Sequence, residues 1–308
     1  MGLTDFFKRT AQALAPEQEL FDEEFQRKLD YLAVISRRLF AGRLRAERRT
    51  KKTGSGIEFA DHREYSAGDD LRYLDWKVFG RSERMLLKLF EEEEDLSIYV
   101  LLDCSESMAF GTPSKFDHGR KLAAALAYVG LANLDRVALV AISTKVDKTL
   151  PTTRGKGRIF KIFDFLRSVR TGGTTALADA ARMFTAQQKR RGIAIVITDL
   201  YDPEGFERGI NAIRYRKFEP IVVHLIDPRE ADPGARGDVT LVDVETGESR
   251  EITLTDGMVR AYREAHLSWR KEIDDFCTSR RVPYVAADVT EPFEDQVLRL
   301  FRRLAVVE

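Results

Sequence analysis

Three oxygen-bearing side chains, Asp103, Ser105 and Ser107, alternate at the end of an apolar run in residues 96–108, Leu-Ser-Ile-Tyr-Val-Leu-Leu-Asp-Cys-Ser-Glu-Ser-Met. The run contains no Gly or Pro, and its composition predicts a strand buried on both faces. The polar side chains then fall at the carboxyl end of that strand, where sites on open α/β sheets are found. Carboxylate and hydroxyl oxygens suit a hard divalent cation.

Two further segments carry the same kind of side chain. Residues 172–175 read Gly-Gly-Thr-Thr, and the apolar run 192–198 ends at Asp199. With a strand order of 3-2-1-4-5-6, the strands ending at Asp103 and Asp199 are neighbours, and the 172–175 loop can close over them. Two carboxylates and up to three hydroxyls, with waters, suit an Mg²⁺ octahedron of about 2.1 Å radius. The neutral hydroxyls leave the ion with positive charge, which a carboxylate from outside can meet. Alternatively, Ser105, Ser107 and Asp199 serve only as helix caps.

The elements that must position these residues alternate regularly along the chain. We expect a strand and helix order typical of a doubly wound, mostly parallel sheet with helices on both faces, an α/β and Rossmann-like fold. The exception is 238–254, whose alternation predicts an inserted β-hairpin. The expected helices cover 115–134, 157–169, 176–190, 205–217, 258–280 and 293–304; the strands cover 137–142, 145–150 (antiparallel, at the edge), 192–198, 221–226 and 282–286.

The first 93 residues have a different character from residues 94–308, and we divide the chain there. Residues 20–40 have the spacing of an amphipathic helix, and the basic, Gly-containing stretch 42–56 predicts a linker. A strand is expected over 85–90, and the acidic run 91–95 is interpreted as a solvated edge. We hypothesise that residues 54–92 and the hairpin 238–254 together form one small accessory β layer.

Composition limits the possible partners. The 308 residues contain 50 Lys plus Arg and 50 Asp plus Glu, so no overall field favours nucleic acid or an anionic membrane. No apolar run approaches the ~20 residues of a membrane span, and residues 1–10 lack a signal-peptide hydrophobic region. The two cysteines, Cys104 and Cys277, fit a reducing compartment. We therefore expect a cytoplasmic protein.

The residues also carry a family resemblance. Asp-Cys-Ser-Glu-Ser-Met from 103, Asp-Arg-Val-Ala-Leu-Val from 135, Gly-Gly-Thr-Thr-Ala-Leu from 172 and Ile-Thr-Asp-Leu from 197 together resemble a von Willebrand factor A domain over about residues 94–308. The resemblance implies a metal-ion-dependent adhesion site that binds Mg²⁺, with Mn²⁺ or Ca²⁺ as alternatives. Its metal ligands would be Asp103, Ser105, Ser107, Thr175 and Asp199, with Thr174 in reserve. One departure is Leu200, where many A domains have Gly or Ser.

The segment before this region resembles a second family. Gly-Ser-Gly-Ile-Glu-Phe from 54 and Arg-Glu-Tyr-Ser-Ala-Gly-Asp-Asp-Leu-Arg-Tyr-Leu-Asp-Trp from 63 are similar to domain of unknown function 58. That resemblance implies an adaptor or chaperone-like partner of a MoxR-type AAA+ ATPase and its clients. Within the signature we expect Asp69 or Asp70 to cap a short helix, with Leu71, Leu74 and Trp76 turned inward. Ion pairs of Arg63, Arg72 and Asp75 would lock the segment onto the sheet domain.

Enzymatic interpretations find little support. The sequence has no Gly-x-Ser-x-Gly elbow and no phosphate-binding Gly-x-x-x-x-Gly-Lys-[Ser/Thr] loop. A metal-assisted hydrolase is one alternative, but no general base is evident beside the expected ion. Nucleic-acid binding through the basic stretch 43–52 is another, opposed by the neutral net charge. The favoured hypothesis is a non-enzymatic, Mg²⁺-dependent protein-binding module, with no nucleic-acid partner and no transmembrane segment.

Overall fold

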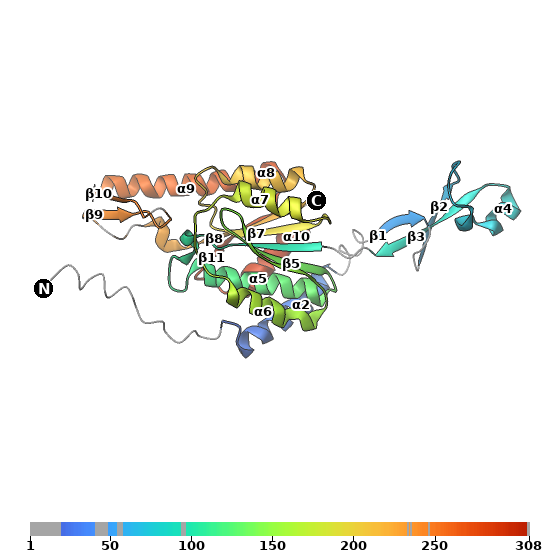
Figure 1. Cartoon of the computed structure of the whole chain (residues 1–308), viewed down its shortest axis with the longest axis horizontal. Helices are drawn as coiled ribbons and strands as arrows, with labels where there is room; N and C mark the ends of the chain where they lie inside the picture. The colour runs from blue at the N-terminus through green and yellow to red at the C-terminus, as the bar shows by residue number, and fades with distance from the viewer. Residues whose placement is uncertain are drawn as a thin grey trace.

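The main body of the protein is built on a six-stranded sheet (Figure 1). The computed structural model describes residues 20–40, 49–53, 58–93, 97–232, 234, 236–245 and 247–306. Every neighbouring pair in the sheet is parallel except the edge pair β5 and β6. The order is β6 (Val146–Thr153), β5 (Arg136–Ile142), β4 (Ser97–Asp103), β7 (Ile193–Thr198), β8 (Glu219–Ile226) and β11 (Tyr284–Asp288).

This order is the predicted 3-2-1-4-5-6 order, with the predicted antiparallel strand at its edge. The chain reverses its direction of winding between β4 and β7, where Leu102 pairs with Ile197 in register. Both strands are almost wholly buried, as their uninterrupted apolar sequences predict for a sheet covered on both faces. The mixed α/β architecture with a mostly parallel sheet is therefore confirmed.

Helices cover both faces of the sheet and enclose two apolar cores. One core lies between the sheet and α5, α6 and α10, and the other between the sheet and α7, α8 and α9 (Figure 1). All six helices lie where the sequence predicts them. Their bounds are α5 Lys115–Ala132, α6 Ile159–Ser168, α10 Phe293–Val306, α7 Leu177–Gln187, α8 Phe206–Tyr215 and α9 Asp256–Ser279.

The predicted N-terminal amphipathic helix is α2, Glu23–Phe40, and it packs within the same chain. Its buried stripe includes Leu29 and Leu32, and the helix contacts α5 and α10. Just before it, the ring of Phe21 stacks on Phe163 of α6, with centroids 4.6 Å apart. The face that the sequence leaves without a partner is thus covered by the body itself.

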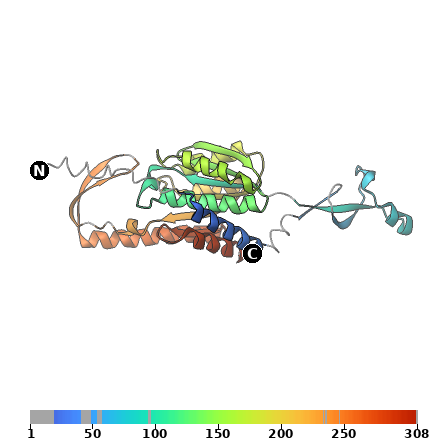
Figure 2. The ribbon, with the colours of Figure 1, turned by 90° about the horizontal axis from the view of Figure 1, so that it is seen from below.

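A second, three-stranded sheet lies apart from the body in both views (Figures 1 and 2). Its order is β1-β3-β2, with strands Arg49–Thr53, Leu86–Glu93 and Glu58–Glu64. Two expectations are corrected here, because part of the basic linker is strand β1 and the acidic run continues the central strand β3. Lys51 pairs with Glu91 in register. The rest of the linker, 42–48 and 54–56, and residues 94–95 of the acidic run lie outside the described residues.

The signature segment packs on this small sheet, through a 3-10 turn Leu71–Tyr73 and helix α4, Trp76–Ser82. Asp70 caps the turn, and Leu74 is buried as predicted. Leu71 and Trp76, expected to turn inward, are 47% and 60% exposed because the small sheet buries little on that side.

The expected ion pairs form, but they do not reach the main body. Arg63 pairs with Asp69, and Arg72 pairs with Asp70. Asp75 caps α4 and lies 3.1 Å from His62 Nε2. Each of these contacts joins residues of the same small sheet and its turn, so they stabilise it internally and do not lock it onto the sheet domain.

The predicted hairpin is β9, Gly237–Val242, with β10, Ser249–Leu254. It forms a separate two-stranded sheet at the end of the body opposite the small three-stranded sheet (Figure 2). The hypothesis of one accessory β layer is therefore wrong. Alternating strands in a sequence show that two segments pair with something, but not that they pair with each other.

Among the residues that the structure describes, no helix is both long enough and apolar enough to cross a membrane. Cys104 and Cys277 are both buried and free of disulfides, and buried free cysteines behave as small hydrophobic residues.

Candidate functional site

Three loops meet at the carboxyl edge of the sheet, where β4 and β7 lie side by side. The first follows Asp103, the second contains 172–175, and the third begins at Asp199. The N–H of Gly172 donates to the carbonyl of Cys104 (2.8 Å), and the N–H of Glu106 donates to that of Gly173 (3.0 Å). Gly173 has φ = 79°, a left-handed conformation that glycine adopts without strain. The first and second loops are therefore fixed against each other.

Asp103 joins the first loop to the end of β7. It is 1% exposed, and its Oδ2 accepts a hydrogen bond from Thr198 Oγ1 at 2.6 Å, while its Oδ1 accepts from the Ser105 N–H at 2.9 Å. Ser105 and Ser107 place their hydroxyl oxygens 3.0 Å apart. Ser105 occupies the position before a 3-10 turn, but its side chain does not cap it. The helix-cap alternative therefore fails for Ser105.

Thr175 lies in the second loop and is 5% exposed. Its hydroxyl donates to Glu245 Oε1 at 2.8 Å, and its N–H donates to Glu245 Oε2 at 3.2 Å. Thr174 is more open, at intermediate burial. Since the Thr175 proton points to a carboxylate, the oxygen lone pairs of that hydroxyl are left for another partner.

Asp199 is fully buried and neutralised by a lysine that the sequence analysis did not single out. Lys115 Nζ lies 2.6 Å from Asp199 Oδ2 and 2.5 Å from Glu230 Oε1, and its side chain is completely buried. The cation also lies 4.9 Å from the centre of the Tyr201 ring. Asp199 Oδ1 accepts the N–H of Tyr201 at 3.2 Å, so Asp199 shapes its own loop and caps no helix.

The third loop also contains a strained residue. Leu200 is buried and has φ = 61°, in the left-handed region that costs a non-glycine residue about 1–2 kcal/mol. This is the position where the sequence departs from many A domains. The departure therefore leaves the turn itself in place and adds backbone strain at the site, where such strain tends to be retained for function.

The electrostatics of the site depend on its burial. Burial, with the nearby charge of Asp199, raises the pKa of Asp103. Burial also raises the pKa of Glu230, although the Lys115 ammonium opposes it. For Lys115, burial works to lower the pKa, but Asp199 and Glu230 outweigh it and the pKa is raised. Lys115 is thus a permanent cation that pairs with Asp199 and Glu230, while Asp103 is held by hydrogen bonds from Thr198 and Ser105.

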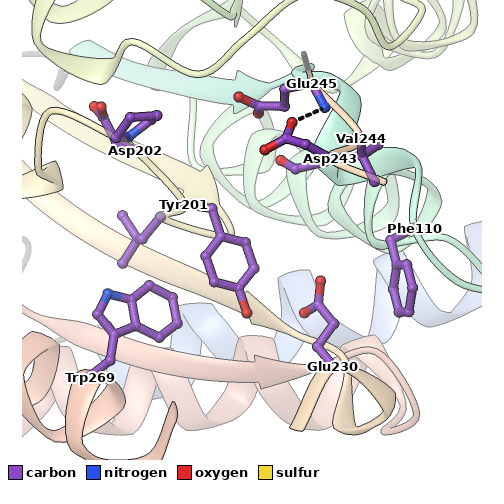
Figure 3. Close-up of a pocket in the computed structure, with 11 residues that line it drawn as sticks. Phe110, Tyr201, Asp202, Glu230, Asp243, Val244, Glu245 and Trp269 are labelled. Carbon is purple, nitrogen blue, oxygen red and sulfur yellow. Dashed lines mark hydrogen bonds between the residues drawn. The ribbon is translucent and has the colours of Figure 1, made fainter. Parts of the chain in front are cut away.

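A cavity of about 450 Å³ lies against the site (Figure 3), and Ser107 is the predicted ligand that lines it. Asp243, Val244 and Glu245 enter it from the hairpin, and Glu230 and Trp269 lie on the other side of Tyr201 (Figure 3). Ser107 also lines the wall, so the first loop is reachable from the cavity. The carboxylates around the opening favour a cation inside it.

The chemistry of the donors suits a hard cation that binds oxygen. The two predicted carboxylates and three predicted hydroxyls are all brought to this edge, and the hydroxyl protons of Thr175 and Thr198 are directed to carboxylates. In the described part of the chain, no group of three or more His, Cys, Asp and Glu side chains is arranged to hold a metal ion. A cation here would therefore rely on the hydroxyls as well as on Asp103.

Four residues that complete the site escaped the sequence analysis, namely Lys115, Thr198, Glu230 and Glu245. Lys115 is the first residue of a predicted helix, where a basic side chain looks like surface. Glu245 lies in a hairpin turn whose sequence does not indicate what the turn contacts. Thr198 alone offered a signal, because it directly precedes Asp199 at a strand end.

Comparison with known proteins places the chain among uncharacterized proteins. Residues 61–272 match the family described as "Protein of unknown function DUF58". An uncharacterized protein of Mycobacterium tuberculosis is 27% identical over 228 residues, which cover 71% of each chain. An uncharacterized protein of Mycobacterium avium is 32% identical over 97 residues, 32% of this chain and 57% of that protein.

Two solved structures that match part of this chain share little sequence with it. The conserved hypothetical protein BatB from Bacteroides thetaiotaomicron is 18% identical with a TM-score of 0.44, covering 69% of this chain and 98% of that one. The open conformation of the pilus adhesin SpaC from Lactobacillus rhamnosus GG is 13% identical with a TM-score of 0.38, covering 69% and 30%. At these values the likeness carries no further conclusion.

Proposed function

This chain belongs to the family described as "Protein of unknown function DUF58", and we propose that it is a non-enzymatic, metal-dependent protein-binding module. In this proposal the body is a von Willebrand factor A-like domain. A Mg²⁺ ion is held by Asp103, Ser105, Ser107, Thr175 and Asp199, and a partner's Asp or Glu binds to it. The ion would supply the positive charge that a carboxylate needs in this acidic cavity.

One observation carries the proposal. The carboxyl ends of β4 and β7 and the loop at 172–175, far apart in the sequence, are joined by hydrogen bonds at one edge of the sheet, with their oxygen side chains together. Because Lys115 holds Asp199 Oδ2 directly, Asp199 would act on the ion through its other oxygen or through water. Asp103 and the three hydroxyls would form the direct ligands.

Several contacts support binding rather than hydrolysis. A hydrolase needs a base beside the ion that is free to take a proton from water. Four carboxylates line the cavity, and each is engaged. Glu230 accepts from Lys115, and Glu245 accepts twice from Thr175, while Asp202 and Asp243 accept backbone N–H groups. The nucleic-acid alternative stays opposed by the neutral net charge of the chain, with 50 Lys plus Arg against 50 Asp plus Glu.

The proposed partner is a MoxR-type AAA+ ATPase, with the module presenting client proteins to it. This part rests on the resemblance of the signature segment to proteins that accompany such ATPases. The exposed Leu71 and Trp76 of the small sheet offer a second surface for that partner, away from the metal site. One protein could then hold a client at one end and the ATPase at the other.

The test is the substitution Asp103→Asn with Asp164→Asn, a change on the exposed face of α6, as its control. Mg²⁺ binding is measured by isothermal titration calorimetry, and purified tagged protein is then used to capture partners in Mg²⁺ and in EDTA, with identification by mass spectrometry. We expect Asp103→Asn to lose Mg²⁺ binding and Mg²⁺-dependent capture while its circular dichroism stays unchanged. Wild-type binding by the Asp103 variant would show that the loop is only structural.

A further inference from the structure

The β9–β10 hairpin reaches over the cavity, but its two strands are mostly exposed and pack little against other residues. Leu241 and Val242 of β9 are 47% and 60% exposed, and Leu254, at the base of β10, is the buried residue of the two strands. Two hairpin strands without a packed face are marginally stable on their own. Something at the tip must therefore hold the hairpin in place.

The tip is shaped to present one side chain. Asp243 Oδ1 accepts the N–H of Glu245 at 2.9 Å, which fixes the turn (Figure 3). From this turn the Glu245 carboxylate accepts two hydrogen bonds from Thr175. The Thr175 hydroxyl donates to one oxygen at 2.8 Å, and the Thr175 N–H donates to the other at 3.2 Å. These contacts span 70 residues of sequence and join the hairpin to a candidate ligand of the site.

Glu245 is at intermediate burial and rests its carboxylate on Thr175 at the mouth of an acidic cavity, a place that a nearby cation would make more favourable. Asp243 and Glu230 line the same cavity, and the ammonium of Lys115 is already shared by Asp199 and Glu230. A cation among Asp103, the serines and Thr175 would supply the missing charge. Glu245 would then stand where an incoming carboxylate is expected.

We propose that Glu245 is an internal ligand of the metal site, which holds the hairpin across the cavity in the place of a partner's carboxylate. The inference rests on the function proposed above and names its regulation. The partner must displace Glu245, exchanging one carboxylate for another, and the hairpin swings away. The exposed apolar surface beside the tip, Val244 and Phe110, then favours a partner whose acidic residue is flanked by apolar ones.

The experiment compares the full chain with Glu245→Ala and with Glu251→Ala, which removes an exposed glutamate from β10 of the same hairpin. Hydrogen–deuterium exchange of amides 237–254 is followed first in EDTA and then in Mg²⁺, and Mg²⁺ affinity is measured by calorimetry. In EDTA we expect Glu245→Ala to exchange about tenfold faster in the hairpin, because local opening sets the exchange rate. In wild type and Glu251→Ala, Mg²⁺ should slow hairpin exchange further, and Glu245→Ala should bind Mg²⁺ about tenfold more weakly.

The outcomes separate this inference from the function on which it rests. Equal hairpin exchange in wild type and Glu245→Ala, with normal Mg²⁺ binding by both, overturns the role of Glu245 and leaves the metal site standing. Faster exchange in Glu245→Ala with no Mg²⁺ binding by any of the three proteins overturns the metal-dependent function, and with it the ligand role of Glu245. Faster exchange together with weaker Mg²⁺ binding supports both.

Discussion

Lys115 is the residue whose charge the site can least lose. It is completely buried and within 2.6 Å of oxygens of both Asp199 and Glu230. A buried ion pair contributes little net stability, but the removal of one partner leaves the other charge in the interior without compensation. The ammonium thereby allows Asp199 and Glu230 to lie close together in the interior.

We expect Lys115→Met to lower the free energy of unfolding by about 3–5 kcal/mol, since two buried carboxylates lose their cation. Urea unfolding followed by far-UV circular dichroism measures the change, and Lys161→Met on the exposed face of α6 serves as the control. A loss below about 1 kcal/mol would mean that water reaches the two carboxylates and replaces the ammonium.

His118 offers a pH test away from the proposed ligands. It is 6% exposed, its Nε2 lies 2.8 Å from Gln296 Oε1, and burial lowers its pKa below the ordinary value of 6.5. Because the unfolded chain then binds a proton more readily than the folded one, His118 makes stability fall as the pH drops below about 6.5.

The variant His118→Gln keeps a hydrogen-bonding side chain but cannot titrate. Between pH 7 and 5 we expect its unfolding free energy to fall less steeply than that of the wild type, by up to about 1.4 kcal/mol per pH unit. Urea titrations at several pH values give both slopes. Parallel slopes would show that His118 takes up its proton equally in the folded and unfolded chains.

Among the elements, helix α2 is the one whose role the structure clarifies most. The sequence gives it an apolar stripe but no indication of what covers that stripe. In the structure it lies across α5 and α10, with Leu29 and Leu32 almost completely buried. The helix is thus a part of the body, although the small sheet separates it from the rest of the body in sequence.

Leu29→Ala should therefore destabilise the body by about 2–5 kcal/mol, as large-to-small changes in a packed core do. Tyr31→Ala, at a position 59% exposed on the same helix, is expected to change little. Thermal and urea unfolding of the two variants provide the comparison. Similar small losses in both would place α2 on a partner protein rather than on its own chain.

At the scale of the whole molecule, the chain separates two surfaces. The candidate metal site and the hairpin lie at one end of the body, and the small sheet with the signature segment lies beyond the other (Figure 2). Among the residues between 49 and 93 whose burial the structure describes, none belongs to either apolar core. The body should therefore not depend on the small sheet for its stability.

Replacement of residues 49–93 by a short Gly/Ser linker tests this separation. We expect the unfolding free energy of the body to change by less than about 0.5 kcal/mol, as for changes away from packed features. Mg²⁺ binding should be unchanged, while capture of the ATPase should be lost. A loss of Mg²⁺ binding would show that the small sheet takes part in the metal site.

The sequence by itself determined the elements of the six-stranded body, their order and the edge of the sheet at which the site lies. Periodicity and composition identify the buried strands, and the handedness of parallel connections leaves few ways to arrange them. The sequence therefore predicts that the strands ending at Asp103 and Asp199 are neighbours. Only the tertiary structure decided which residues complete the site. Lys115 contacts Asp199 across 84 residues of sequence and Glu230 across 115 residues, and Glu245 contacts Thr175 across 70 residues. The type of a side chain and the local periodicity do not predict such contacts, because the contacts form only when the sheet has folded. The same reason explains why two strand-rich segments, alike in pattern, ended at opposite ends of the molecule.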